Sequence, residues 1–331
     1  MQFYELLHDT TYRYTSPVLL SQQVAHLRPR ESLRQRLVSY VLEIDPAPAQ
    51  RRERTDFFGN PVSCFSLYAP HDRLTVRARS RVGVLAPDWP APAASLPWEA
   101  ARDYLLDALS GHAPLQAEAR DAGQYRFASP FVALGAEAAR YAGQYRFASP
   151  FVALGAEAAR YADYALQCFT PERPLLEAAA ALSARIHADF RFDPAATDVA
   201  TPVAQVFAAR RGVCQDFSQL MIACLRSLGL AARYVSGYLL TEPPPGQARL
   251  VGADASHAWV GVWCPGVGWV EFDPTNDMQP GDGHITLAWG RDYGDVCPLR
   301  GVILGGAGHA AEVAVTVMPV EAACDDIRAP H

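Results

Sequence analysis

Three side chains that could together perform nucleophilic catalysis occur in separate local patterns of this chain. Cys214 stands within Arg211–Phe217, His257 opens a segment of alternating hydrophobicity, and Asp273 closes the next such segment. A thiol, an imidazole and a carboxylate form the set that turns a cysteine into a nucleophile, because the carboxylate orients the imidazole and the imidazole takes the thiol proton. The sequence therefore predicts cysteine chemistry, provided that the fold brings the three groups together.

The cysteine stands at the start of a predicted helix. Apolar residues recur at helical spacing from Phe217 to Leu228, and Gly229 follows as a stop. Unpaired N–H groups and the macrodipole at a helix N-terminus favour a thiolate. A buried structural cysteine is the commoner alternative for a lone cysteine. Cys224 fits that alternative because it lies in the apolar stripe, whereas Cys214 does not.

The histidine and the aspartate are predicted to lie on one β-hairpin. Residues 257–263 and 269–273 alternate in hydrophobicity, and the segment between them is rich in turn residues. A turn centred near Pro265 would set His257 opposite Asp273, so that Asp273 binds one ring nitrogen and leaves the other for the thiol. Taken singly, the two residues could instead be a structural histidine and a turn-opening Asp-Pro pair.

These segments resemble the core of the transglutaminase-like superfamily. The motifs that carry the resemblance are Gly212-Val213-Cys214-Gln215-Asp216-Phe217, Arg233-Tyr234-Val235-Ser236-Gly237-Tyr238, His257-Ala258-Trp259-Val260 and Phe272-Asp273-Pro274-Thr275. The resemblance implies that Cys214 is the nucleophile, His257 the base and Asp273 the group that orients His257. It also implies an α+β, papain-like fold in which the cysteine helix packs on an antiparallel sheet.

More narrowly, the chain is similar to bacterial transglutaminase-like proteins described as candidate cysteine proteases, which begin with a β-rich domain. Short alternating runs separated by turn residues support such a β-sandwich-like domain over residues 1–85. A proline-rich linker over 86–97 follows. We therefore expect a transglutaminase-like catalytic domain over residues 98–331.

One segment is duplicated without a change. Residues 122–141 and 142–161 have the same 20-residue sequence, which indicates a recent duplication or an artefact rather than a repeat architecture. We expect only one copy to pack in the position that the family uses, with the other extending a helix or lying on the surface.

The composition is that of an ordinary globular protein. Of 331 residues, 50% are hydrophobic and 19% charged, which allows two domains and a sizeable core. A net charge of −6 gives no indication of a nucleic-acid partner. Seven cysteines without a CxxC pair argue against a zinc site and favour a reducing compartment. No leader sequence or membrane-spanning run is recognisable, so we expect a cytoplasmic protein with no membrane partner.

The predicted reaction is acyl transfer on peptide or side-chain amides of a peptide or protein substrate, through a thioester. Hydrolysis by a peptidase or amidase is favoured, and the alternatives are transglutamination of an amine and an inactive interaction module. No cofactor is expected. No metal is expected either, because Asp282, Asp292 and Asp295 are too sparse for the acidic calcium loops of animal transglutaminases.

Four further residues are candidates for the oxyanion site or the substrate cleft. Gln215 could donate to the oxyanion beside the backbone N–H of Cys214. Asp216 could line the cleft, but a helix-capping role is favoured. Trp259 and Tyr238 could wall a groove, with burial in the core as the alternative.

Overall fold

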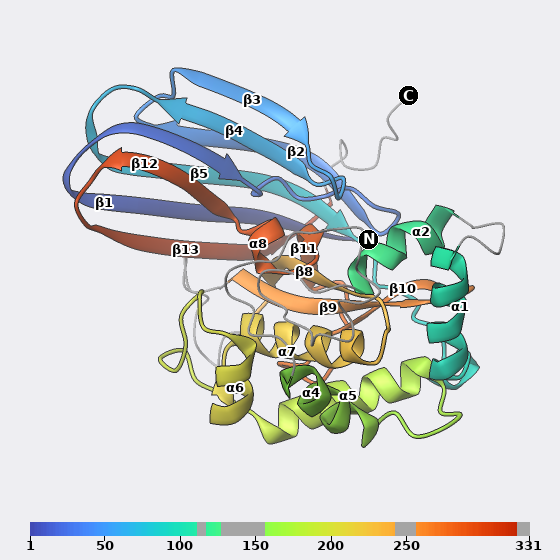
Figure 1. The fold of residues 1–331 in the computed structure, drawn as a ribbon. Coiled ribbons are helices and arrows are strands. Elements are labelled where there is room, and N and C mark those ends of the chain that lie inside the picture. Colours follow the sequence, from blue (N-terminus) through green and yellow to red (C-terminus); the bar gives the residue numbers. More distant parts are fainter. Residues whose placement is uncertain (111–116, 127–155, 242–255, 323–331) are drawn as a thin grey trace, which may run out of the picture.

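The computed structural model describes residues 1–110, 117–126, 156–241 and 256–322 (Figure 1). The chain forms a β-rich part and a part in which helices cover a smaller sheet, with the two parts packed side by side. This arrangement agrees with the predicted fold class of an all-β region followed by helices packed on an antiparallel sheet.

The β-rich part is one antiparallel sheet, which among the described residues has seven strands. Its strands are β1 (Gln2–Ala25), β2 (Gln35–Asp45), β3 (Gln50–Thr55), β4 (Pro61–Leu67), β5 (His71–Val84), β12 (Leu299–Gly305) and β13 (His309–Val320). The long strand β1 pairs with β5 and β13 along residues 3–13 and with β4 and β12 along residues 21–25. Apolar side chains from β1, β2, β4, β5 and β12 pack together, so the curved sheet encloses a core of its own.

The second sheet has the strand order β10-β9-β8-β11. Its strands are β8 (Ala232–Leu239), β9 (Ser256–Cys264), β10 (Gly268–Phe272) and β11 (His284–Gly290). Helix α7 (Cys214–Ser227) lies on one face of this sheet, and α4 (Ala156–Leu166), α5 (Leu175–Asp189) and α6 (Val203–Ala209) cover α7 from the other side (Figure 1). The remaining elements are η1 (Pro92–Ala94), α1 (Trp98–Ser110), α2 (Ala117–Gly123), η2 (Gln124–Arg126), β6 (Arg191–Phe192), β7 (Arg211–Gly212) and α8 (Tyr293–Val296).

Helix α7 is the central helix of the largest apolar cluster. Its predicted apolar residues, including Phe217, Leu220, Met221 and Leu225, are buried against the helices and the sheet. Gly229 adopts a φ of 81°, the left-handed conformation that glycine tolerates best, and ends the helix as the sequence predicted. Cys214 is therefore the first residue of a helix that is fixed along most of its length.

The hairpin formed by β9 and β10 differs from the predicted register by two residues. Cys264 pairs with Gly268, and Phe272 pairs with Val260. The turn is centred on Gly266, because Gly266 and Gly268 both adopt positive φ and so accommodate a three-residue connection. A continuation of this register would set Asp273 opposite Trp259, with His257 two residues further along the same face. The prediction of a shared face was right, and the prediction of a directly opposed pair was wrong.

The tail of the chain returns to the first sheet. Strand β12 pairs with β1 from Leu299, and β13 pairs with β1 up to Val320. Strand pairing thus groups residues 299–320 with the β-rich part, whereas the sequence had grouped them with the catalytic domain. The expectation about the duplicated segment falls mostly on residues 127–155, which lie outside the described residues.

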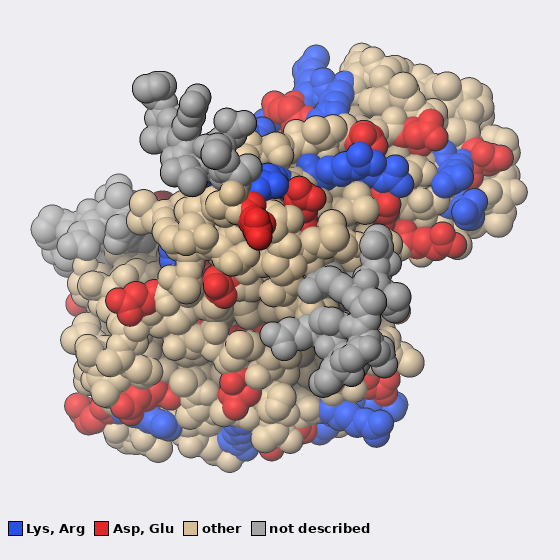
Figure 2. Space-filling model, turned by 180° about the vertical axis from the view of Figure 1, so that it is seen from behind, with Lys and Arg blue, Asp and Glu red and all other residues tan. Residues whose placement is uncertain are grey.

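Charged side chains of both signs are interspersed over the face of the molecule shown in Figure 2. Several pair across strands of the first sheet, including Arg77 with Asp9 at 2.6 Å. Within the described ranges, none of the helices has both the length and the apolarity to span a membrane.

Candidate active site

The first turn of α7 holds Cys214 at the edge of the second sheet. The thiol is half-buried, and its Sγ lies 4.0 Å from the carbonyl oxygen of Ser256, the first residue of β9. Gly212 precedes the helix at a place where a Cβ atom would lie 2.5 Å from the Asp216 carboxylate. The close approach therefore requires glycine at this position.

Asp216 caps the helix that carries Cys214. Its Oδ2 accepts hydrogen bonds from the backbone N–H of Val213 at 2.8 Å and from the Thr197 hydroxyl at 2.6 Å. Burial raises the pKa of Asp216, and these two hydrogen bonds oppose the rise. The side chain acts on the helix start, which is the role that the sequence analysis favoured over cleft lining.

The Gln215 side chain is held in the loop beside the site. Its Nε2 donates to the carbonyl oxygen of Val199 at 3.1 Å, and the residue is largely buried. This hydrogen bond occupies one of the two amide protons that an oxyanion donor would use.

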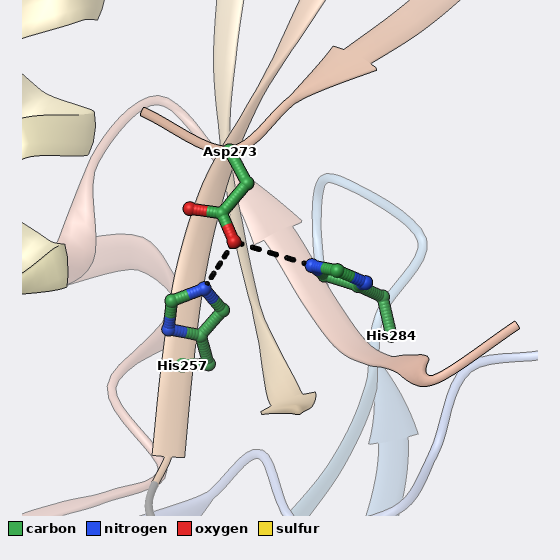
Figure 3. Close-up of side chains that lie close together, drawn as sticks. All are labelled: His257, Asp273 and His284. Carbon is green, nitrogen blue, oxygen red and sulfur yellow. Dashed lines mark hydrogen bonds and ion pairs between the residues drawn. The ribbon is translucent and has the colours of Figure 1, made fainter. Parts of the chain in front are cut away.

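His257 connects the carboxylate to the thiol. Its Nε2 donates to Asp273 Oδ2 at 2.7 Å, and its other ring nitrogen points away from the carboxylate (Figure 3). Cys214 lies close enough to His257 to raise the pKa of the imidazole. Because Nε2 is engaged by Asp273, Nδ1 is the nitrogen left for the thiol. The fold thus brings together the three residues that the sequence analysis singled out.

The Asp273 carboxylate is completely buried and receives hydrogen bonds on both oxygens. Oδ1 accepts from the backbone N–H groups of Thr275 and Asn276, at 2.9 and 3.3 Å. Oδ2 accepts from the Asn276 amide at 2.7 Å in addition to His257. Asp273 therefore opens a turn, as an Asp-Pro pair commonly does, and orients His257 at the same time.

The protonation of this cluster follows from its burial and hydrogen bonds. Burial opposes a charge on His257, but the hydrogen bond to Asp273 and the nearby Cys214 outweigh it and raise the pKa of His257 to about 10. Burial alone would raise the pKa of Asp273, whereas hydrogen bonds from His257, His284 and Asn276 hold it well below its usual range. The arrangement favours an imidazolium beside an ionised carboxylate.

His284 belongs to the same cluster and was missed by the sequence analysis. It is the first residue of β11, it is buried, and its Nε2 lies 3.3 Å from Asp273 Oδ2 (Figure 3). The alternation from residue 284 to 289 could have indicated a strand. Its position beside Asp273 could not have been inferred, because β11 pairs with β8 rather than with the strand before it.

Trp259 lies in the core rather than in an open groove. It is fully buried, its indole N–H donates to Glu271 at 2.9 Å, and its ring lies edge-on to His284. A Cβ atom at Gly237 would meet this ring at 2.6 Å, so the glycine makes room for the indole. The alternative of core burial is the correct one for Trp259.

Tyr238 faces the β-rich part and not the cysteine. Its hydroxyl pairs with His8 Nδ1 at 2.9 Å, and its ring packs among Tyr4, Leu6 and Ile285. Burial lowers the pKa of His8 to about 4. The prediction that Tyr238 could line the cleft is wrong, because its side chain fills the contact between the two sheets.

The ligand-type atoms of His257, Asp273 and His284 all lie within 4.8 Å of one another, a donor set that could also bind a divalent cation. In this structure the carboxylate oxygen instead accepts a hydrogen bond from each imidazole. The donor protons therefore lie in the space that an ion would need. The expectation that the protein requires no metal remains a prediction.

Comparison with known proteins identifies relatives of both parts of the chain. The family model of the bacterial transglutaminase-like N-terminal region matches residues 4–83, and that of the transglutaminase-like superfamily matches residues 162–274. Uncharacterized proteins of Mycobacterium tuberculosis and Mycobacterium bovis are each 40% identical over 326 residues, covering 96% of this chain and 93% of theirs.

Two further similarities concern proteins that have been described. A crystal structure of a candidate cysteine protease from Cytophaga hutchinsonii superposes with a TM-score of 0.68 at 16% identity, covering 97% of this chain and 92% of that one. At that identity the likeness shows the fold alone. A protein-glutamine gamma-glutamyltransferase of Pseudomonas aeruginosa is 40% identical over 76 residues, which is 23% of this chain and 11% of that protein.

Proposed function

We propose that this chain, which belongs to the transglutaminase-like superfamily of cysteine-based acyl-transfer proteins, is a peptidase or amidase. Cys214 attacks the carbonyl of a peptide or side-chain amide, and water releases the acyl group from the resulting thioester. Peptides or proteins of the cytoplasm are the proposed substrates. The cysteines at described positions are all free, which supports a reducing compartment.

One observation carries the proposal: Asp273 holds one nitrogen of the His257 imidazole at 2.7 Å, and Cys214, at the start of α7, is the second neighbour that raises the pKa of His257. A pKa of about 10 for His257 supports an imidazolium at neutral pH. An adjacent imidazolium stabilises a thiolate, which is the nucleophilic form of cysteine.

The proposed steps balance in atoms and protons. The Cys214 sulfur forms a bond to the amide carbon, and the His257 imidazolium gives its proton to the departing nitrogen as the C–N bond breaks. The neutral imidazole then takes a proton from water, and the hydroxide oxygen bonds to the thioester carbon. The C–S bond breaks, the carboxylic acid leaves, and the thiolate–imidazolium pair is restored.

The backbone at the start of α7 is the proposed oxyanion site. Cys214 and Gln215 are the first residues of the helix, so their N–H groups have no acceptor within it. One such donor contributes about 3 kcal/mol to stabilisation of the transition state. The Gln215 side chain has a weaker claim because it already donates to Val199.

Hydrolysis is favoured over transfer to an amine because the thiol is only half-buried among the described residues. A transferase must keep water away from its thioester while it admits an amine. The similarity to a glutamyltransferase over 76 residues supports transfer to an amine as the second candidate. The inactive-module alternative is disfavoured, because a binding module gains nothing from a thiol, an imidazole and a buried carboxylate in contact.

The test is to trap and partition the thioester. The protein is incubated with p-nitrophenyl acetate, and mass mapping locates the acetyl group. Release is then followed with and without added methylamine. We expect acetylation of Cys214 and release as acetate in both cases. Release as N-methylacetamide would favour the transferase.

Two variants serve as controls. The His257→Ala variant should lose the acylation, and the Cys64→Ala variant should retain it, because Cys64 is a half-buried cysteine of the first sheet. Equal acylation of several cysteines, independent of His257, would leave the interaction module as the function.

A further inference from the structure

Two imidazoles share one oxygen of the Asp273 carboxylate. His257 Nε2 lies 2.7 Å and His284 Nε2 3.3 Å from Oδ2, and all three side chains are buried. The two histidines come from β9 and β11, and the carboxylate lies between them (Figure 3). The proposed reaction accounts for the first imidazole and leaves the second unexplained.

The second imidazole is held in one tautomer. The backbone N–H of Gly281 donates to His284 Nδ1 at 3.3 Å, and the backbone N–H of His284 donates to the Gly281 carbonyl at 3.3 Å. Because Nδ1 accepts a hydrogen bond, the proton of a neutral ring resides on Nε2. His284 therefore donates to Asp273, as His257 does.

We infer that His284 is a positioning residue for the proposed acyl transfer: it fixes the Asp273 carboxylate in the orientation that receives the His257 N–H. The inference rests on the proposed function. A carboxylate with two N–H donors on one oxygen cannot rotate without losing both hydrogen bonds. Each donor also stabilises the ionised form of the carboxylate. His284 touches no reacting atom; its ring lies 5.9 Å from that of His257, and its hydrogen bond acts on His257 through Asp273.

The other charged groups near His284 belong to neighbouring elements. Arg233 of β8 and Glu271 of β10 pair with each other at 3.4 Å, and Arg34 stacks on the Trp89 ring at 4.1 Å. On the other side of the carboxylate lie His257 and, beyond it, Cys214. Since both ring nitrogens of His284 are engaged by Gly281 and Asp273, its influence on the thiol passes through the carboxylate.

A cavity gives access to His284. It has a volume of about 230 Å³, and His284 forms part of its wall together with Arg233, Glu271, Trp269 and Trp289. Shortening His284 would enlarge this cavity next to Asp273. The space would suit an added imidazole, which offers the same N–H donor.

The test measures the rate of Cys214 alkylation by iodoacetamide from about pH 5 to about pH 9, a range that spans thiolate formation at activated cysteines. We expect the His284→Leu variant to react about 10- to 100-fold more slowly near neutral pH, which is the loss of one hydrogen bond to a charged group. The rise of the rate with pH should also move to higher pH. The His284→Gln variant should retain most of the rate, because its amide N–H reaches the place of Nε2.

Imidazole rescue separates positioning from packing. Added imidazole should restore the alkylation rate of the His284→Ala variant and leave the wild type unchanged. The matched control is His26→Leu, which removes a second buried histidine whose Nε2 contacts an aspartate, at 3.4 Å from Asp56. That variant should keep the wild-type alkylation rate.

Two results would overturn the inference. One is a His284→Leu variant that alkylates with the wild-type rate and pH profile. The other is a folded His284→Ala variant on which imidazole has no effect, and this result decides the matter if the Leu variant does not fold. A wild type without selective, His257-dependent alkylation of Cys214 would instead contradict the proposed function itself.

Discussion

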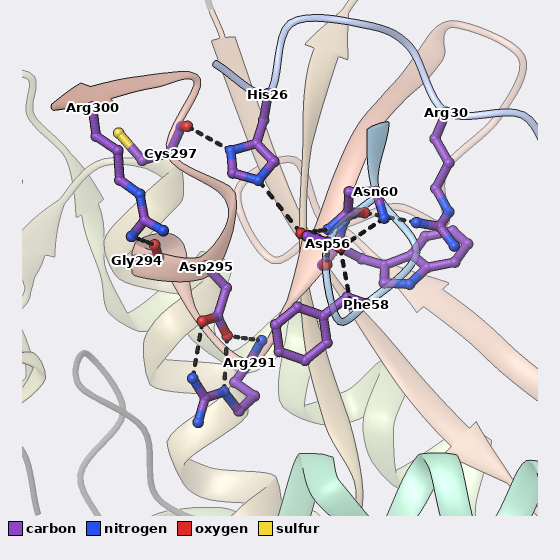
Figure 4. A network of polar contacts seen from close by, with 11 residues as sticks. His26, Arg30, Asp56, Phe58, Asn60, Arg291, Gly294, Asp295, Cys297 and Arg300 are labelled. Carbon is purple, nitrogen blue, oxygen red and sulfur yellow. Dashed lines mark hydrogen bonds and ion pairs between the residues drawn. The ribbon is translucent and has the colours of Figure 1, made fainter. Parts of the chain in front are cut away.

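Among the described residues, two sets of a cysteine, a histidine and an aspartate can be compared, and the first is the proposed active site of Cys214, His257 and Asp273. The second set is Cys297, His26 and Asp56, at the contact between the two parts of the chain (Figure 4). Asp56 resembles Asp273 closely. Its Oδ1 accepts from two backbone N–H groups of its own turn, and its Oδ2 accepts from an asparagine amide, here Asn60, at 2.8 Å.

The two sets differ in what the second ring nitrogen of the histidine contacts. His26 Nδ1 donates to the carbonyl oxygen of Cys297 at 3.1 Å, whereas the Cys297 thiol donates to the carbonyl oxygen of Leu299 and its sulfur accepts from the Tyr293 hydroxyl. Burial raises the pKa of Cys297. A histidine held by a turn aspartate is thus a general structural device, and it becomes a catalytic candidate only where the free nitrogen meets a thiol at a helix start.

Removing each thiol in turn tests the difference between the two sets most directly, because it has the largest expected effect. The Cys214→Ala variant should lose acyl transfer by about 10³-fold or more, because no nucleophile remains. The Cys297→Ala variant should keep the rate and lose only about 1 kcal/mol of unfolding free energy. Acylation kinetics and urea denaturation check the pair. Comparable loss of acylation in both variants would contradict the distinction.

Removing each imidazole should have the next largest effect. The His257→Ala variant should lower the rate of Cys214 alkylation at pH 6.5 by about 10²-fold, the lower range for a general acid–base group. The His26→Ala variant should leave that rate unchanged, because its imidazole does not contact a thiol. Mass spectrometry measures the alkylation of Cys214 in both variants, with the remaining cysteines as internal references.

The pH dependence of stability should also separate the two sets. In the folded protein the pKa of His257 is raised from 6.5 to about 10. The contribution of His257 to the free energy of unfolding is therefore complete below pH 6.5 and is lost as the pH rises to about 10. Hydrogen bonds from His26 and Asn60 outweigh the effect of burial and lower the pKa of Asp56. The contribution of Asp56 to the free energy of unfolding is therefore lost on acidification instead.

Thermal melting of variants measures this difference. The advantage of the wild type over His257→Gln should shrink from pH 6.5 towards pH 10. Its advantage over Asp56→Asn should stay constant over that range and shrink in acid. An advantage over His257→Gln that grows on the alkaline side would contradict the raised pKa.

The smallest effect on the reactivity of Cys214 is expected for a change in the Asp56 turn. The Asp56→Asn variant should lose about 1–3 kcal/mol of unfolding free energy, because buried donors lose a charged acceptor. Its alkylation rate per folded molecule should equal that of the wild type. A slower reaction in fully folded protein would mean that the turn acts on the active site.

The sequence predicted those features that depend on local pattern. The apolar spacing after Phe217 located the start and the end of the cysteine helix, and alternation located the hairpin. The two-residue error in register arose because a turn can be centred on Pro265 or on Gly266, and the positive φ of Gly266 and Gly268 decides between them.

The features that the sequence did not predict depend on distant pairing. The side to which Tyr238 points depends on β8 lying between β9 and β11, and on the first sheet covering that end of the strand. His284 reaches Asp273 only through the same strand order. Asp56 and His26 meet across the contact between the two parts of the chain, for which no local pattern exists.

The pairing of β1 with β13 has a consequence for the order of events during synthesis. Residues 3–14 of β1 leave the ribosome long before their partners, residues 309–320. Until those partners are made, one edge of β1 presents twelve residues of unpaired backbone, the kind of edge that joins other chains. Completion of the first sheet must therefore wait until residues 309–320 have been translated, and all three proposed catalytic residues precede them.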